Sequence, residues 1–344
     1  MKALVKTQKA KGSIELQDVP VPEISSEEVL VRVKAAGICG GDVHILHNEY
    51  QYSAPLILGH EFSGEIAAVG NRVTGWGAGD RVVSELHTLA CQTCRYCKTG
   101  NSQICSDKRP PGTYVDGAFA EFIKLPANLL HRIPDNITFE EAALTEPTAI
   151  AVHGLLEKTV VEPEDVVVVL GAGPIGLQSA QAARAAGAAK VIMAGTTRRS
   201  SVRLDTARFL NFDGVLDIDH DNLDELVKSL TGGIGADVVI DACGAEAAIN
   251  QAVDLVRRGG RICGLGISGR DKIAFSWDKA VLKDCHLIFS FSSNYMSWER
   301  ALSMISRGKV QVRPLISHCL PLEAWEEGFA AIERGEAVKV LLLP

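Results

Sequence analysis

Apolar and polar positions follow two different patterns along the chain, and the change lies near residue 150. Before it, short segments of alternating polarity such as Val29–Val33 and Phe119–Lys124 are separated by glycine and proline turns, which predicts a β-rich region. After it, Val166–Leu170 is a continuous β-branched run, typical of a strand buried on both faces. The alanine-rich segment Leu177–Ala186 that follows predicts a helix.

Strand and helix patterns continue to alternate up to about residue 289. The further strands expected there are Val191–Ala194, Asp237–Asp241, Arg261–Gly264 and His286–Phe291, with helices at Leu223–Leu230 and Ala247–Arg257. Repeated strand–helix–strand units predict an α/β fold with a parallel, doubly wound sheet. A mixed tail follows, with helices expected near Trp298–Ile305 and Leu322–Arg334.

Length and charge narrow the class of protein. A chain of 344 residues is expected to form two domains, because single cores rarely grow past roughly 250–300 residues. The net charge of −7 gives no reason to expect nucleic acid or a membrane surface as partner. The start MKALVKTQKAKGS lacks the apolar core of a signal peptide, and no apolar run approaches the ~20 residues that span a bilayer. We therefore expect a cytoplasmic protein.

Four of the nine cysteines stand together in the run CQTCRYCKTGNSQIC, at Cys91, Cys94, Cys97 and Cys105. Disulfides within so short a run would have poor geometry, and a reducing cytosol disfavours them. Four thiolates can instead bind one tetrahedral zinc ion, and this set leaves no open position, so we interpret it as a structural zinc site. The other cysteines in apolar surroundings, Cys243, Cys263, Cys285 and Cys319, are interpreted as core residues.

A second group of metal-ligand types lies upstream. Cys39 stands in GICGGDVH, His60 and Glu61 follow in GHE, and Glu146 in TEPT is a fourth candidate. A catalytic zinc needs three protein ligands and one open position, which this set can provide. Because a second carboxylate would make the site anionic, we expect only one of the two glutamates to bind at a time. Asp42 is either a turn residue or an acceptor for a ring N–H of His60.

A glycine turn after Val166–Leu170 reads Gly171-Ala172-Gly173-Pro174-Ile175-Gly176. The motif GxGxxG is weak alone, but here it follows a predicted strand and opens a predicted helix, as dinucleotide binding requires. Gly171 suits a tight turn, Gly173 a close approach of pyrophosphate to the backbone, and Gly176 close helix–strand packing. Pro174 and Ile175 would open the helix whose N-terminus faces the phosphates. The alternative is a purely structural turn.

The end of the second strand of this unit indicates which dinucleotide is bound. NAD-binding folds usually carry Asp or Glu there, whereas this chain reads Gly195-Thr196-Thr197-Arg198-Arg199. Without the acid a 2′-phosphate is not repelled, and arginine can bind it bidentately. We therefore expect NADP(H) to be preferred over NAD(H), the alternative being that both arginines are only solvated loop residues.

The segments GICGGDVH, GHEFSGEIAAVG with GAGDRV, the four-cysteine run, TEPTAIAVHG and VVVVLGAGPIGL together resemble the zinc-containing medium-chain dehydrogenase/reductase superfamily. The resemblance covers essentially the whole chain and is greatest to the polyol (sorbitol-type) and threonine dehydrogenase branches, because liver-type alcohol dehydrogenases carry cysteine where Glu146 stands. It implies an α/β protein with a GroES-like β-rich catalytic domain in 1–150 and 290–344, including the four-cysteine zinc lobe 91–105. A Rossmann domain with a doubly wound parallel sheet, 151–289, would lie between them.

The resemblance also implies site residues and assembly. It assigns the catalytic zinc to four ligands, Cys39, His60, Glu61 and Glu146. It assigns a structural zinc to the four-cysteine run, which gives two zinc ions per subunit. The active site would lie in the cleft between the domains. Homodimers or homotetramers would form by pairing of the last Rossmann strand, near Leu287–Phe291.

Two departures from the family bear on mechanism and substrate. Gly41 stands where the family has Ser or Thr to pass on the substrate proton, so the relay must use water, the cofactor ribose or His44. We take His44 as the outer proton acceptor; the alternative is an idle surface histidine. Polyol dehydrogenases carry an arginine near Ser290, which this chain lacks. The expected activity is oxidation of a polyol, a sugar-derived or another secondary alcohol, with a threonine-type dehydrogenase or a catalytically inert zinc-binding relative as alternatives.

Overall fold

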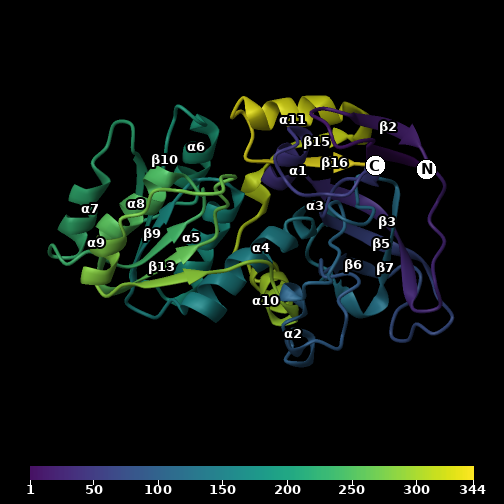
Figure 1. Ribbon diagram of the computed structural model, residues 1–344, viewed down its shortest axis with the longest axis horizontal. Coiled ribbons are helices and arrows are strands. Elements are labelled where there is room, and N and C mark those ends of the chain that lie inside the picture. Colours follow the sequence, from purple (N-terminus) through teal and green to yellow (C-terminus); the bar gives the residue numbers. More distant parts are fainter.

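The computed structural model describes all residues from Met1 to Pro344, in two parts that lie side by side (Figure 1). One part holds a six-stranded parallel sheet in the order β11-β10-β9-β12-β13-β14. This is the doubly wound order, which reverses direction between β9 and β12. Its strands are β9 (Val166–Leu170), β10 (Lys190–Gly195), β11 (Gly214–Asp217), β12 (Ala236–Asp241), β13 (Val256–Gly264) and β14 (His286–Phe289). Its helices are α5 (Pro174–Ala186), α6 (Ser201–Phe209), α7 (Leu223–Leu230), α8 (Glu246–Leu255) and α9 (Trp277–Leu282).

The elements predicted from the hydrophobic pattern are present in this part, although the helix expected to reach Arg257 ends at Leu255, where β13 takes over. One strand, β11, and two helices, α6 and α9, were not predicted. Val167 to Val169 are fully buried in β9, as expected for a strand covered on both faces. The omitted strand is β11, which has only four residues and begins with glycine, so it carries almost no periodic signal.

The other part contains two antiparallel-rich sheets. A three-stranded sheet has the order β2-β1-β4, and a larger one runs β15-β16-β3-β5-β6-β8 with β7 also paired to β3. These strands are β1 (Lys2–Lys6), β2 (Ile14–Asp18), β3 (Glu28–Gly37), β4 (Leu56–Ile57), β5 (Glu61–Val69), β6 (Arg81–Ser84), β7 (Phe122–Pro126), β8 (Leu130–Arg132), β15 (Ile316–Pro321) and β16 (Lys339–Leu343). The end of the chain therefore returns to the sheet built by its beginning, and both termini lie at the same side of the molecule (Figure 1).

Short helices connect these strands and cover the sheet edges. They are α1 (Gly40–Leu46), α2 (Arg95–Lys98), η1 (Ser102–Ile104), η2 (Ala127–Leu129), α3 (Phe139–Ala142), α4 (Thr145–Val152), η3 (His153–Thr159), α10 (Tyr295–Ser306), η4 (Arg313–Leu315), η5 (Leu322–Ala324) and α11 (Trp325–Glu333). No helix combines the length and the apolar character that crossing a membrane would require.

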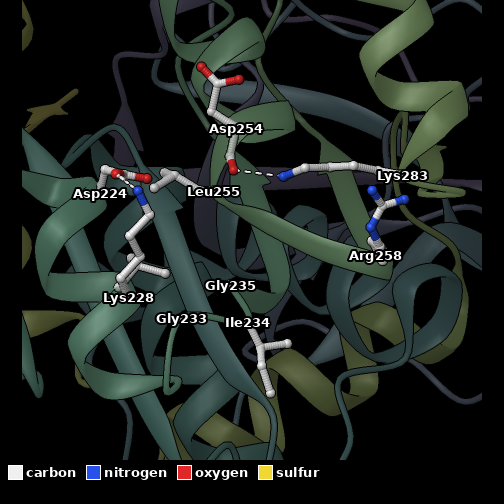
Figure 2. A pocket seen from close by; sticks show the side chains of 10 residues that line it. Asp224, Lys228, Gly233, Ile234, Gly235, Asp254, Leu255, Arg258 and Lys283 are labelled. Carbon is white, nitrogen blue, oxygen red and sulfur yellow. Dashed lines mark hydrogen bonds and ion pairs between the residues drawn. The ribbon is translucent and has the colours of Figure 1, made fainter.

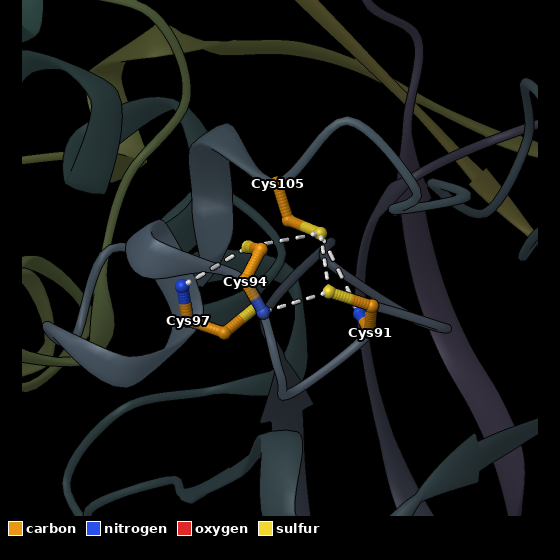
Figure 3. Close-up of side chains that lie close together, drawn as sticks. All are labelled: Cys91, Cys94, Cys97 and Cys105. Atoms are coloured by element: carbon orange, nitrogen blue, oxygen red, sulfur yellow. Dashed lines mark hydrogen bonds between the residues drawn. The ribbon is translucent and has the colours of Figure 1, made fainter.

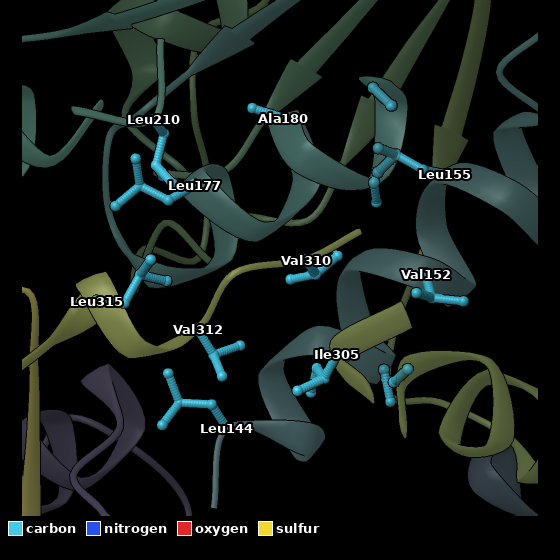
Figure 4. Packing of buried hydrophobic residues seen from close by; sticks show 14 of the residues in the cluster. Leu144, Val152, Leu155, Leu177, Ala180, Leu210, Ile305, Val310, Val312 and Leu315 are labelled. Atoms are coloured by element: carbon cyan, nitrogen blue, oxygen red, sulfur yellow. The ribbon is translucent and has the colours of Figure 1, made fainter. Parts of the chain in front are cut away.

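One hydrophobic core joins the two parts. Leu144 and Val152 at the ends of α4 pack in the same cluster as Leu177 of α5 and Ile305 of α10 (Figure 4). Val312, from the segment that leads back to β15, completes this contact. Because this cluster is continuous from one sheet to the other, the two parts are packed against each other through apolar side chains.

Candidate active site

Strand pairing brings the first predicted metal ligands together. β3 and β5 are antiparallel, with Gly37 opposite Glu61, and Cys39 follows the end of β3 as the N-cap of α1. His60 and Glu61 stand at the start of β5, so the ligand atoms of Cys39, His60 and Glu61 all lie within 4.8 Å of one another. The cysteine and the His-Glu pair are far apart in sequence, and it is the sheet register that makes them one site.

Gly37 is required beside this cluster. A Cβ atom added there would lie 2.5 Å from Oε2 of Glu61, closer than real Cβ contacts. Gly41 also faces the cluster, with its Cβ position 3.8 Å from Sγ of Cys39 and 4.0 Å from Cε1 of His60. Gly41, which stands where the family has Ser or Thr, therefore borders the metal ligands.

Lys339 is a component of the site that the sequence analysis missed. It lies on β16, is 2 % exposed, and its Nζ donates to Oε2 of Glu61 at 2.6 Å and to the carbonyl of Ile38 at 3.0 Å. Although burial lowers it, the pKa of Lys339 is raised overall by the negative charges of Glu61 and Cys39. No local motif marks this lysine, because only the pairing of β16 with β3 carries it to the ligands.

Glu146 lies near this group but outside the compact set. It is buried at the start of α4, and burial raises the pKa of its carboxyl to about 7, with the charge of Glu61 adding to the effect and that of His60 opposing it. Asp42 and Glu61 are also buried. Three buried carboxyls and a thiol thus face one buried ammonium, Lys339, and this excess of negative donors fits a divalent cation.

Asp42 has a structural task besides the predicted one. Its Oδ2 accepts a hydrogen bond from the backbone N–H of Cys39 at 2.9 Å, which fixes the turn that presents the thiol. Its Oδ1 faces Nδ1 of His60 at 3.7 Å, and neither atom makes a hydrogen bond. That distance is too long for a hydrogen bond, so the role of Asp42 as acceptor for His60 stays a prediction.

The four-cysteine run folds into a lobe around α2 and η1 in which the sulfur atoms converge (Figure 3). Sγ of Cys105 lies 3.6 Å from that of Cys91 and 3.9 Å from that of Cys94, so none of these is a disulfide. Such separations match the edge of a zinc–sulfur tetrahedron, about 3.8 Å for bonds of ~2.3 Å. Backbone N–H groups of Cys94 and Cys97 donate to the sulfurs of Cys91 and Cys94, which favours thiolates.

The predicted dinucleotide turn has the geometry that its motif requires. Gly171 has φ +110°, and a Cβ at Gly176 would lie 1.8 Å from the carbonyl oxygen of Gly171. Gly173 caps α5, whose first residues are Pro174 and Ile175. The N-terminal end of this helix, with its free N–H groups, therefore follows a turn with only the small side chain of Ala172, at the switch point between β9 and β12.

Arg203 is a second residue that the sequence analysis missed. One of its guanidinium nitrogens lies 4.0 Å from the Cβ position of Gly173, so it borders the place where a pyrophosphate would lie. Its Nε donates to the carbonyl of Ala337 at 3.2 Å, and Ser200 Oγ donates to Gly335 at 2.6 Å. The cofactor-binding part is thereby tied to the segment that leads into β16.

The end of β10 carries the residues predicted to choose the cofactor. Gly195 ends the strand, and Thr196 donates a hydrogen bond to Asp219, which also faces the exposed Arg198 at 3.5 Å. The end of β10 thus lacks the usual Asp or Glu, and Asp219, which follows β11, partly takes its place. Arg199 makes no ion pair, and its carbonyl packs closely on Gly335.

His44 stands where the two parts meet. It lies in α1, its Nδ1 is 3.1 Å from Oε2 of Glu49, and its ring approaches to 3.8 Å of the Cβ position of Gly269. Gly269 belongs to the loop after β13, so the ring is placed between the metal ligands and the cofactor-binding part. This position suits an outer proton acceptor.

One cavity lies away from these residues. A hollow of about 410 Å³ is bordered by Lys228, Asp254, Arg258 and Lys283, beside the amino ends of β12 and β13 (Figure 2). Open α/β sheets bind ligands at the carboxyl ends of their strands. Since Lys283 bonds to the carbonyls of Asp254 and Val256, its charge is already used within the fold.

Comparison with known proteins identifies the family. Residues 25–135 match the alcohol dehydrogenase GroES-like domain, and residues 174–307 match the zinc-binding dehydrogenase domain. The chain is 39% identical to sorbitol dehydrogenase of Halalkalibacterium halodurans, covering 100% of this chain and 99% of the relative. It is 33% identical to D-arabitol-phosphate dehydrogenase of Enterococcus avium (99% and 97% covered) and 36% identical to L-threonine 3-dehydrogenase of Rhizobium etli (99% and 98%).

Several solved structures are similar to this protein over the whole length of its chain. A zinc-binding dehydrogenase of Sinorhizobium meliloti bound to NADP has a TM-score of 0.90 at 28% identity, with 100% of this chain and 99% of that chain covered. Galactitol-1-phosphate dehydrogenase of Escherichia coli has a TM-score of 0.89 at 27% identity, with both chains covered completely. An alcohol dehydrogenase of Escherichia coli in complex with NADH has a TM-score of 0.89 at 27% identity, covering 100% and 99%.

These relatives confirm the predicted α/β fold and the resemblance to the polyol and threonine branches. The chain belongs to the zinc-containing medium-chain dehydrogenase/reductase superfamily and is a zinc-type, NAD(P)-dependent alcohol dehydrogenase.

Proposed function

We propose that the protein oxidises a secondary alcohol of the polyol or sugar-derived class, or reduces the matching ketone, with NADP(H) as cofactor. The observation that carries the proposal is the compact group Cys39, His60 and Glu61, in a chain that also has a dinucleotide turn at Gly171–Gly176. We also propose two zinc ions per subunit, one at this group with Glu146 as an exchanging ligand, and one at the four cysteines. Demetallation followed by zinc readdition tests the proposal: oxidation must disappear and return with the metal content.

The residues around the group have separate tasks in this reaction. Zinc held there would supply a Lewis acid that lowers the pKa of an alcohol hydroxyl. Cys39, His60 and one glutamate would hold the ion and leave one position for the alcohol. Lys339 holds Glu61 by a buried ion pair, so Glu61 as a ligand would also keep its contact with the ammonium. Gly41 leaves room for water beside Cys39, and the proton leaves through that water to His44.

Arg198, Arg199 and Arg203 support the preference for NADP(H). Arg203 borders the pyrophosphate position, and Arg198 is 80 % exposed in its side chain, free to leave Asp219 for a 2′-phosphate. The preference for NADP is tested by measuring KM for NADP and for NAD. The same constants are measured for the variants Arg198→Ala and Asp219→Asn. Arg198→Ala should raise KM for NADP and leave KM for NAD unchanged, whereas a wild-type preference for NAD would refute the proposal.

The free edge of β14 supports assembly into a homodimer or homotetramer. β14 pairs only with β13, and its side chains Leu287 and Phe289 are 38% and 69% exposed. An unpaired apolar edge is well suited to pair with a second copy. Light scattering after size-exclusion chromatography measures the state, and Phe289→Lys should yield monomers. The cytoplasmic location also stays a prediction.

Threonine oxidation is a second candidate, favoured by the 36% identity to L-threonine 3-dehydrogenase. Two other relatives are named for phosphate esters of polyols, D-arabitol phosphate and galactitol 1-phosphate. Absorbance at 340 nm with a panel of polyols, polyol phosphates, diols and L-threonine separates these substrates. The absence of turnover with full zinc and bound cofactor would leave the catalytically inert alternative.

A further inference from the structure

The carboxylate of Asp241 lies where the two halves of the parallel sheet meet. Asp241 ends β12, is 3% exposed, and is paired with Leu170 of β9, the residue before the dinucleotide turn. β9 and β12 are the strands between which the sheet order reverses. In doubly wound sheets a dinucleotide crosses the crevice at this reversal, with one mononucleotide half on each side. Asp241 is therefore buried at the place where the cofactor would pass from one half to the other.

The hydrogen bonds of this carboxylate all go to the loop that follows it, residues 242–244, called here the β12 loop. Its Oδ1 accepts from the backbone N–H groups of Cys243 at 3.2 Å and Gly244 at 3.1 Å, and from the thiol of Cys243 at 3.3 Å. Its Oδ2 accepts from the N–H of Gly244 at 3.1 Å. The side chain of Asp241 therefore fixes the conformation of the β12 loop.

The β12 loop packs against the dinucleotide turn. A Cβ atom added at Gly171 would lie 2.9 Å from Cβ of Cys243 and 3.3 Å from its backbone nitrogen. One added at Gly176 would lie 3.4 Å from Cβ of Ala242. The loop that Asp241 fixes is therefore one side of the turn on which the pyrophosphate would lie.

The same aspartate connects the β12 loop to the loop after β13, residues 265–269, called here the β13 loop. The backbone N–H of Gly266 donates to the carbonyl of Asp241 at 3.0 Å. Gly244 has φ +67°, and a Cβ atom there would lie 2.5 Å from the backbone of the β13 loop, so the two loops are in direct contact. Since the β13 loop also approaches His44, both loops lie on the side of the sheet that meets the catalytic part.

We propose that Asp241 is a positioning residue for the nicotinamide half of the cofactor. Its carboxylate holds the β12 loop against the turn, and its carbonyl holds the β13 loop beside it. The adenosine half belongs to the other side of the switch point, at the ends of β10 and β11. Loss of the carboxylate should therefore weaken binding of the nicotinamide half selectively. The proposal concerns the cofactor alone and does not depend on which alcohol is oxidised.

Binding of whole cofactors and of their adenosine halves tests this selectivity. The zinc-loaded, full-length protein is titrated by calorimetry, without alcohol, with NADPH and NADH and with 2′,5′-ADP and AMP, which lack the nicotinamide nucleotide. In Asp241→Asn an amide N–H₂ takes the place of one acceptor and faces the N–H groups of the β12 loop. The Kd for NADPH and NADH should rise about 10- to 100-fold, the range expected when a hydrogen bond to a charged group is lost. The Kd for the two fragments should not change.

Two further variants provide the controls. Asp237→Asn removes a carboxylate from the opposite end of β12, where it accepts from the backbone N–H of Val166 at 2.8 Å and pairs with Arg257. This variant should have a lower thermal midpoint but the same Kd values as wild type. Gly244→Ala keeps the carboxylate of Asp241 but disturbs the β12 loop, because its Cβ would meet the β13 loop. It should reproduce the selective loss of the whole cofactors.

Three results would overturn the proposal. Equal weakening of cofactors and fragments in Asp241→Asn would mean that the carboxylate only stabilises the fold of this part. An unchanged Kd for NADPH and NADH would mean that the loop keeps its shape without it. The same selective loss in Asp237→Asn would mean that the effect is not specific to the switch point. If Asp241→Asn does not fold, Gly244→Ala decides: a selective loss supports the proposal, and an equal loss or none refutes it.

Discussion

Replacing Lys339 by methionine tests how the buried charges of the active site are balanced. The ammonium is 2% exposed, lies 2.6 Å from Oε2 of Glu61, and bonds also to the carbonyl of Ile38. Methionine fills a similar volume but leaves the carboxylate of Glu61 buried without its cation. Removing one partner of such a pair costs about 3–5 kcal/mol, most of which is the penalty of the charge left behind.

The effect is measured by urea unfolding of the metal-free protein, followed by tryptophan fluorescence. Lys339→Met should lower the free energy of unfolding by about 3–5 kcal/mol, and by less when zinc is bound, because the ion offsets the charge of Glu61. The double variant with Glu61→Gln should recover part of the loss, with a coupling energy of about 1–3 kcal/mol. Leu341→Met, farther along the same strand, is the matched control for a change of packing alone.

The sign of the pH dependence is fixed by the pKa of Lys339, which is raised in the folded protein. A raised lysine pKa contributes stability that is complete below the unfolded value of about 10.4 and is lost only as pH rises through the folded value. The cost of Lys339→Met should therefore be the same at pH 6 and pH 9. A cost below about 1 kcal/mol, or a coupling energy near zero, would refute the buried ion pair.

Three further predictions concern other parts of the molecule. Gly37→Ala should weaken zinc binding at the catalytic site by more than about tenfold, measured by competition with a chelator, because its Cβ would displace Glu61. Cys97→Ser should lower the zinc content from two ions to one per subunit and reduce the thermal midpoint, while kcat of the surviving enzyme stays the same; loss of both ions would contradict the assignment of separate sites. Asp80→Asn should cost about 0.5–1 kcal/mol at pH 7, because hydrogen bonds, first from Arg132, lower the pKa of Asp80. That stability is present above the unfolded pKa of about 3.9 and is lost as pH falls through the lower folded value, so variant and wild type should converge in acid.

The ligand types and the cofactor turn could be predicted because they are encoded locally. The four cysteines lie within one short run, and the glycines of 171–176 stand directly between a strand and a helix, so chain connectivity alone brings them close. The same holds for β9 and α5, whose apolar pattern follows the geometry of a buried strand and an amphipathic helix. β11 was not predicted, because four residues are too few to show the alternating apolar pattern of a strand.

Contacts between distant segments depended on the tertiary structure. Lys339 and Glu61 are 278 positions apart, and only the antiparallel pairing of β16 with β3 brings them together. Arg203 reaches Gly173 because α6 packs beside the turn, and Lys108 reaches Phe291 because the two parts share one core. The sequence by itself determined which donors and which turn are present, since those follow from residue type and short-range spacing. The tertiary structure decided which charges surround them, because electrostatic neighbours are set by distance in space and not by separation along the chain.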